Sequence, residues 1–149
     1  MKKIFILFMM MIVANIWTVN QQNFLGFWKT KGGKSIIKIY KKNNGEFAGK
    51  IVWLAEPLDK NKQPKTDSKN PNENLKNRPL LNLELLQGFH YKDSVLKGGK
   101  IYDPKSGKTY NCIIKYKNSN LVIRGFIGIS LFGRSETWER TEMKINTKL

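Results

Sequence analysis

Short stretches of alternating apolar and polar residues run along most of the chain, and Gly, Asn and Pro residues separate them. In residues 35–42, for example, Ile37 and Ile39 share one face of the pattern. A period of two residues is typical of a half-buried β-strand. The pattern predicts eight strands, at residues 24–31, 35–42, 47–54, 83–90, 94–102, 109–116, 121–127 and 134–141.

The connections between these strands are mostly short. Gly32-Gly33 and Asn43-Asn44-Gly45 are sequences typical of tight hairpins, and Gly98-Gly99 within a strand predicts a bulge. Residues 80–89 fit neither period cleanly, and we interpret them as a strand from residue 83. The chain has too few helical segments to cover a sheet, which argues against an α/β fold. We therefore expect an all-β fold, an eight-stranded up-and-down antiparallel barrel, whose interior is filled or holds one small ligand.

Residues 55–79 break the alternation. The segment is rich in charged residues and proline, and it shows no apolar periodicity. A connection this long inside a compact domain is usually functional or disordered. Two interpretations stay open, a lid over the barrel mouth and a mobile surface excursion. A helical turn is expected near residues 72–77, with Pro71 close to its start.

The N-terminus has the pattern of an export signal. Lys2 and Lys3 precede ten unbroken apolar residues, Ile4 to Val13, which are too few to span a bilayer. We assign residues 1–20 to a signal peptide cleaved between Ala14 and Gln22, with an uncleaved membrane anchor as the alternative. Residues 21–149 then form one domain of ordinary size, located in the periplasm or secreted.

The chain is strongly basic, with a formal net charge of +16. Only four of its 27 basic residues are Arg, and the lysines are spread through turns and strand faces. Base reading favours clustered basic residues and Arg forks, so we expect no specific nucleic-acid partner. The pattern indicates a solvated basic surface, or a weak contact with anionic envelope surfaces.

Catalytic and metal-binding patterns are scarce. His90 is the only histidine, and Cys112 is the only cysteine. These residues predict no metal site and no cofactor. The sequence also lacks a G-x-S-x-G nucleophile motif. We expect a protein that is not an enzyme, with a hydrolase as a remaining alternative. Alternation places Cys112 on an apolar face as a buried thiol, the alternatives being a reactive thiol or an intermolecular disulfide.

Five residues are candidates for ligand binding. Trp53, Tyr102, Tyr110 and Phe126 fall at strand ends or on apolar faces, where they line a pocket or belong to the core. Arg124 lies between apolar neighbours and therefore needs a partner. An internal Asp or Glu, or the carboxylate of a ligand, would satisfy its charge.

Four further residues have a structural pattern. Gly26 and Trp28 lie in the first predicted strand, and Trp138 and Arg140 lie in the last. This arrangement resembles the calycin signature of lipocalins and fatty-acid-binding proteins, in which the Trp closes one end of the barrel and an Arg lies over it. A guanidinium stacks well on an indole face. The chain lacks the T-D-Y motif and the long C-terminal helix of lipocalins.

A second resemblance covers nearly the whole predicted domain. The ordered motifs resemble the exported bacterial family called domain of unknown function 2147 (DUF2147). The resemblance implies a lipocalin-like β-barrel in the periplasm or secreted, and it brings no established activity. A departure is Asn82, where the family commonly has Gly. The motifs are Gly26-Phe27-Trp28, Gly49-Lys50-Ile51-Val52-Trp53, Asp67, Asn70-Pro71, Arg78-Pro79-Leu80-Leu81, Gly98-Gly99-Lys100-Ile101-Tyr102-Asp103-Pro104, Gly107-Lys108-Thr109-Tyr110, Arg124-Gly125-Phe126-Ile127-Gly128, Phe132-Gly133-Arg134 and Thr137-Trp138-Glu139-Arg140.

The leading functional hypothesis is an exported binding protein. In it, an apolar cavity opening beneath residues 55–79 carries a small apolar or amphipathic molecule. The alternative is a filled barrel that acts as an envelope-associated interaction module, either binding a partner or forming a homodimer. Its contact surface would be an apolar rim at Ile129, Leu131 and Phe132.

Overall fold

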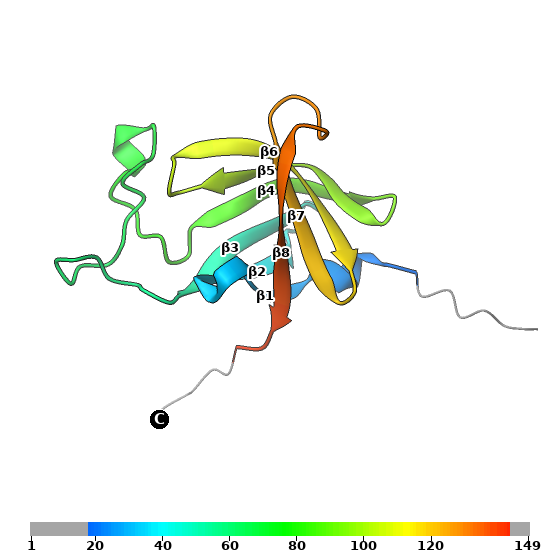
Figure 1. The fold of residues 1–149 in the computed structure, drawn as a ribbon, viewed down its shortest axis with the longest axis horizontal. Coiled ribbons are helices and arrows are strands. Elements are labelled where there is room, and N and C mark those ends of the chain that lie inside the picture. Colours follow the sequence, from blue (N-terminus) through cyan, green and yellow to red (C-terminus); the bar gives the residue numbers. More distant parts are fainter. Residues whose placement is uncertain (1–17, 144–149) are drawn as a thin grey trace, which may run out of the picture.

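The computed structural model describes residues 18–143, so nearly all of the predicted signal peptide (residues 1–20) lies outside the described residues. Eight antiparallel strands pair in chain order, and the last pairs with the first to close a barrel (Figure 1). The predicted fold is therefore confirmed. The strands are β1 (Gly26–Lys29), β2 (Ser35–Lys41), β3 (Phe47–Leu54), β4 (Glu84–Lys92), β5 (Val95–Asp103), β6 (Lys108–Lys117), β7 (Asn120–Phe126) and β8 (Gly133–Thr141).

Three short 3-10 helices complete the secondary structure: η1 (Gln21–Phe24), η2 (Lys31–Gly33) and η3 (Glu73–Leu75). The first strand is shorter than predicted at both ends. Phe24 belongs to η1, which the side chain of Asn20 caps, and Lys31 begins η2, which replaces the tight hairpin predicted at Gly32-Gly33. η3 confirms the helical turn expected near residues 72–77. The predicted bulge at Gly98-Gly99 is also confirmed, since the register of β5 with β6 shifts between Leu96 and Gly99. Over the described residues, no helix has the length and apolar character needed to cross a bilayer.

The barrel closes through a short seam between β1 and β8. Three residue pairs form it, with Trp28 opposite Arg140 at its centre. The Arg140 guanidinium lies 4.2 Å from the Trp28 ring centroid and donates to the carbonyls of Leu25 (3.1 Å) and Asn23 (2.6 Å). Gly26 has a φ of 115°, and a Cβ there would lie 3.1 Å from an Arg140 nitrogen. Glycine at this position therefore lets the arginine approach the first strand.

Large apolar side chains occupy the barrel interior. Two glycines show how closely they pack: a Cβ on Gly99 would lie 2.4 Å from the Phe89 ring, and one on Gly49 would lie 2.8 Å from Leu86. Bulky residues on one strand thus fill the space left by glycine on the next. The most deeply buried large side chains are Trp28, Trp138, Phe24, Phe47, Phe89, Ile37, Ile39, Leu86, Leu96, Ile114, Leu121 and Ile123.

Arg140→Ala is expected to lower the free energy of unfolding by about 1–3 kcal/mol, because it removes the stacking on Trp28 and two charge-assisted hydrogen bonds. Urea denaturation followed by tryptophan fluorescence measures the change. Arg134→Ala, on the same strand and exposed, is the matched control and should stay within about 0.5 kcal/mol of wild type. Equal losses in the two variants would contradict the role given to the seam.

Gly99→Ala is expected to destabilise the barrel by about 1–3 kcal/mol, because the new methyl group collides with the ring of Phe89. Gly125→Ala is the control, since a Cβ there meets its nearest neighbours at 3.6 Å, an ordinary contact distance. Thermal or urea unfolding of the two variants makes the comparison. If both substitutions were neutral, the interior would be less tightly filled than the structure indicates.

Candidate functional site

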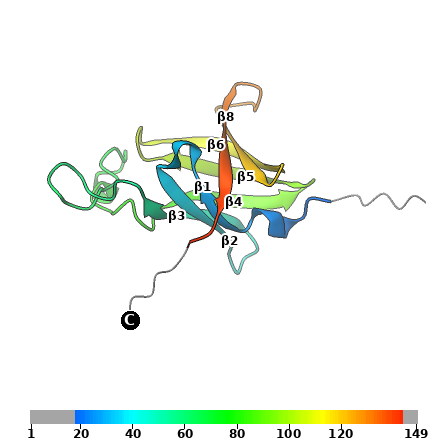
Figure 2. The same ribbon diagram turned by 60° about the horizontal axis from the view of Figure 1, so that its bottom comes forward.

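Residues 55–79, between β3 and β4, form an ordered excursion that extends from one end of the barrel (Figures 1 and 2). Two isolated bridges fold the excursion back on itself, Leu58 with Pro64 and Thr66 with Pro79. The amide of Asp67 also donates to the carbonyl of Arg78 at 2.9 Å. The backbone is thus held in place as a defined wall beside the barrel.

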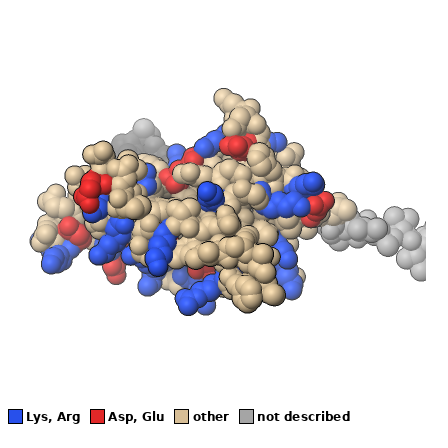
Figure 3. All heavy atoms as spheres, turned by 90° about the horizontal axis from the view of Figure 1, so that it is seen from above, with Lys and Arg blue, Asp and Glu red and all other residues tan. Residues whose placement is uncertain are grey.

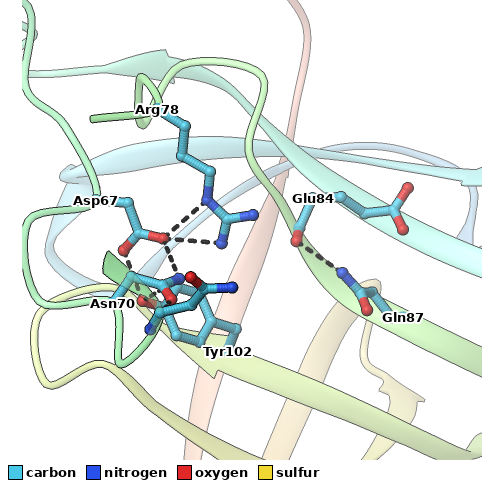
Figure 4. A network of polar contacts seen from close by, with 7 residues as sticks. Asp67, Asn70, Arg78, Glu84, Gln87 and Tyr102 are labelled. Carbon is cyan, nitrogen blue, oxygen red and sulfur yellow. Dashed lines mark hydrogen bonds and ion pairs between the residues drawn. The ribbon is translucent and has the colours of Figure 1, made fainter. Parts of the chain in front are cut away.

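Asp67 is the centre of a polar network that fixes this excursion (Figure 4). The residue is fully buried. Its carboxylate accepts hydrogen bonds from Arg78 Nε (2.9 Å), Asn70 Nδ2 (2.7 Å) and the Tyr102 hydroxyl (2.6 Å), and Arg78 Nη2 lies 2.8 Å away. Burial, followed by the hydrogen bond to Asp67, raises the pKa of Tyr102. Tyr102 therefore remains a neutral donor that links β5 to the excursion.

The network lies on the outer wall of the barrel. Ile101 pairs with the buried Leu86 and approaches Gly125 from inside the barrel. Because successive side chains of a strand point to opposite faces, Tyr102 points outward. A second contact supports the same placement: a Cβ on Gly107 would lie 1.9 Å from the carbonyl oxygen of Lys69. The excursion therefore packs directly on the turn between β5 and β6.

Between the excursion and the outer faces of β4 and β5 lies an open groove of about 530 Å³, which we call the wall groove. This volume lies in the range of small-molecule sites. Glycine backbone and short side chains leave its floor open, and charged side chains surround it. The lining residues are Lys42, Glu46, Asn70, Pro71, Arg78, Glu84, Leu85, Gln87, Gly88, Gly98, Lys100, Tyr102 and Thr109.

The charges of the wall groove differ in how they are paired. Lys42 lies 2.7 Å from Glu84, which also accepts a hydrogen bond from the Tyr40 hydroxyl at 2.5 Å. Burial, and then the contact with Glu84, raises the pKa of Tyr40 to about 12, so its hydroxyl stays protonated at neutral pH. Lys100 makes no ion pair with another described residue. Its ammonium group is the unneutralised cation of the groove.

On the face shown in Figure 3, lysines and arginines are scattered and do not form one patch. A second open groove, of about 610 Å³, lies between η2 and β8. An ion pair between Lys29 and Glu139, 3.1 Å long and exposed, lies along it. Backbone and small polar side chains make up most of its other lining, so it offers fewer specific contacts than the wall groove.

The structure separates the five residues predicted to bind a ligand. Tyr102 lines the wall groove, whereas Trp53, Tyr110, Arg124 and Phe126 line neither groove. Trp53 is 41% exposed near the end of β3. Tyr110 pairs with Ile101, and Phe126 pairs with Asn111.

The internal Asp or Glu partner expected for Arg124 is wrong, because Arg124 makes no ion pair within residues 18–143. Its guanidinium donates to the carbonyls of Ser130 (2.7 Å) and Leu131 (3.1 Å) and to the hydroxyl of Ser135 (2.9 Å). Alternation in β7 places Arg124 on the outer face, since its neighbour Ile123 is buried. Backbone carbonyls therefore satisfy the charge that the sequence pattern left unpaired.

The remaining chemical candidates have simple environments. Cys112 is buried, and burial raises the pKa of its thiol to about 12, which confirms the buried-thiol interpretation. Within residues 18–143, no three His, Cys, Asp or Glu side chains gather closely enough to hold a metal ion.

The sequence pattern gave no role to Asp67, Arg78 or Lys100. A buried carboxylate within a charged segment leaves no periodic signal, although Asp67 and Arg78 do fall in the DUF2147 motifs.

The fold defines the class of protein: a lipocalin-like eight-stranded barrel. A solved structure with this fold is protein HP1028 from Helicobacter pylori, described as belonging to the lipocalin family. It is 24% identical, with a TM-score of 0.69, and the match covers 79% of this chain and 82% of that chain. The family model described as "Uncharacterized protein conserved in bacteria (DUF2147)" matches residues 26–140, so the chain belongs to that family. No curated protein matches the sequence.

Asp67→Asn is expected to lower the free energy of unfolding by about 2–4 kcal/mol, because it removes the charge that pairs with Arg78 in a buried setting. Hydrogen exchange should also speed up at the amides of residues 64–80. Asp59→Asn is the control, because Asp59 is exposed and an Asn side chain still accepts the turn hydrogen bonds. Unchanged exchange in the Asp67 variant would show that the network does not hold the excursion.

Proposed function

We propose that the protein is an exported, non-enzymatic binding protein whose ligand is a small amphipathic molecule with an anionic group. The observation that carries the proposal is the wall groove, an open site of about 530 Å³ with an unneutralised ammonium group at Lys100. The apolar N-terminal segment behind Lys2 and Lys3 supports export to the periplasm or the exterior.

The groove suits an amphipathic molecule because it offers two kinds of surface. Leu85, Pro71 and the backbone of Gly88 and Gly98 present apolar or uncharged area. Lys100 presents a cation, which attracts an anionic group more strongly in a partly enclosed groove than in open water.

The walls of the groove are preorganised. Asp67 locks the excursion that carries Asn70 and Arg78, and strand pairing fixes the β4 and β5 side. A ligand therefore binds without first ordering the loop, which reduces the entropic cost of association. This placement differs from the apolar cavity expected inside the barrel, where Phe89 and Leu86 pack closely against Gly99 and Gly49.

Octanoate and 1-octanol are a suitable pair of probes, since they share a chain length and differ in charge. Octanoate should bind more tightly and shift the amide resonances of Gly98, Lys100 and Thr109 in two-dimensional NMR spectra. Lys100→Gln should weaken octanoate binding by roughly three- to tenfold, because it removes the cation. Binding of 1-octanol should hardly change.

Two further variants sharpen this test. Thr109→Trp should block both probes by filling the groove, and Lys115→Gln, a lysine of β6 that does not line the groove, should leave both unaffected. If octanoate shifted the amides of Tyr110 and Gly125 in place of the groove amides, the ligand would enter the barrel mouth. That result, or equal binding by wild type and Lys100→Gln, would contradict the proposal.

The alternative of a filled barrel that acts as an envelope-associated module is supported by one specific observation. Several large apolar side chains of the loop between β7 and β8 are exposed. None of these side chains lines the wall groove, so the two functions are compatible.

A further inference from the structure

The loop between β7 and β8 presents a concentrated apolar surface to solvent. Ile127, Leu131 and Phe132 are each 74% exposed, and Ile129 is 60% exposed. The loop projects beyond the strands in two views of the molecule (Figures 1 and 2). Single exposed apolar residues are ordinary on protein surfaces, but four within six residues at a protruding tip indicate a contact surface.

The backbone of the loop is held in this conformation by internal hydrogen bonds. Arg124 donates to the carbonyls of Ser130 and Leu131, and the amide of Phe132 donates to the carbonyl of Ile129 at 3.2 Å. Three consecutive carbonyls of the tip are therefore already satisfied. Entry of a peptide segment into an apolar medium is costly mainly when its backbone groups lack partners. The hydrogen bonds from Arg124 thus lower the cost of moving the loop backbone into a water-poor environment.

The positive charge of the protein indicates that the apolar medium contacted by the loop is a negatively charged bilayer. The chain carries a formal net charge of +16, and the sequence of the tip, residues 127–132, contains no acidic residue. The exposed Arg134 lies two residues after the tip, near the start of β8. A negatively charged bilayer attracts such a protein, and its interface accepts apolar side chains together with flanking basic ones.

A second copy of the chain is a poorer occupant for two reasons. Two molecules with this charge repel each other. In addition, stable protein interfaces bury on the order of 1,200–2,000 Å², far more than a six-residue tip provides.

From these contacts and charges, we propose that residues 127–132 insert into the interfacial region of an anionic lipid bilayer and hold the barrel at the membrane surface. The contact uses Ile127, Ile129, Leu131 and Phe132 as the inserting side chains and Arg124 as the residue that positions the loop. The inference goes beyond the proposed ligand binding and does not depend on it, because no residue of the tip lines the wall groove.

Vesicle co-sedimentation tests the proposal. For this test, the protein is produced from Thr18 onward. This removes the apolar N-terminal segment and retains every contact described for the barrel. We expect binding to vesicles of phosphatidylglycerol mixed with phosphatidylcholine, and much weaker binding to phosphatidylcholine alone. The double variant Leu131→Ser/Phe132→Ser should lower the partition coefficient by about tenfold or more, because two large apolar groups no longer leave water.

The matched control is Leu58→Ser/Leu81→Ser, which removes two leucines that are 48% and 45% exposed on other loops. It should bind as wild type does. Phe132→Trp adds a local readout, since insertion moves its fluorescence emission to shorter wavelength only when anionic vesicles are present. Circular dichroism verifies that each variant keeps its strands.

Three outcomes would overturn the proposal. Undiminished vesicle binding by the Leu131/Phe132 variant would show that the loop does not insert. Equal binding to neutral and anionic vesicles would remove the role of charge. A dimer seen by light scattering in the absence of lipid, and lost in the same variant, would identify a second copy as the occupant of the loop.

Discussion

The contact between Arg140 and Trp28 joins the first and the last strand of the barrel, and the remaining architecture depends on it. β1 and β8 share only three residue pairs, so backbone pairing alone makes a short seam. The guanidinium covers one face of the indole and binds carbonyls near the N-terminus. The indole Nε1 also donates to the carbonyl of Phe24 at 2.9 Å, which attaches the turn η1 to the same ring. One tryptophan therefore connects the entry turn, the first strand and the last strand.

Once the barrel is closed at this seam, large apolar side chains pack closely in its interior. Phe89 lies over Gly99 and Leu86 lies over Gly49, so large residues use the space that glycine provides. The surfaces with free recognition groups are consequently on the outside, on the outer faces of β4 and β5 and in segments that connect strands. Two of these segments are each stabilised by one buried or bridging charge. Asp67 organises residues 55–79, and Arg124 organises the loop between β7 and β8.

The abundant positive charge has two effects, a long-range electrostatic field and specific binding at a few positions. The lysines on the face shown in Figure 3 are dispersed, and dispersed charges contribute a long-range field and little specific binding. Individual positions become specific only where the fold limits access to water or combines a cation with apolar area. Lys100 in the wall groove and Arg134 near the apolar tip are two such positions.

The sequence alone determined the strand count, the closed barrel and a helical turn near residues 72–77, because period-two alternation and turn residues are local signals. It also identified Trp28 and Arg140 through a motif resemblance. Only the tertiary structure decided that Asp67 is buried and that Tyr102 faces the outer wall. It likewise decided that Arg124 binds backbone carbonyls in place of a carboxylate. These contacts join residues distant along the chain or depend on the path of a loop, and no periodic pattern encodes either property.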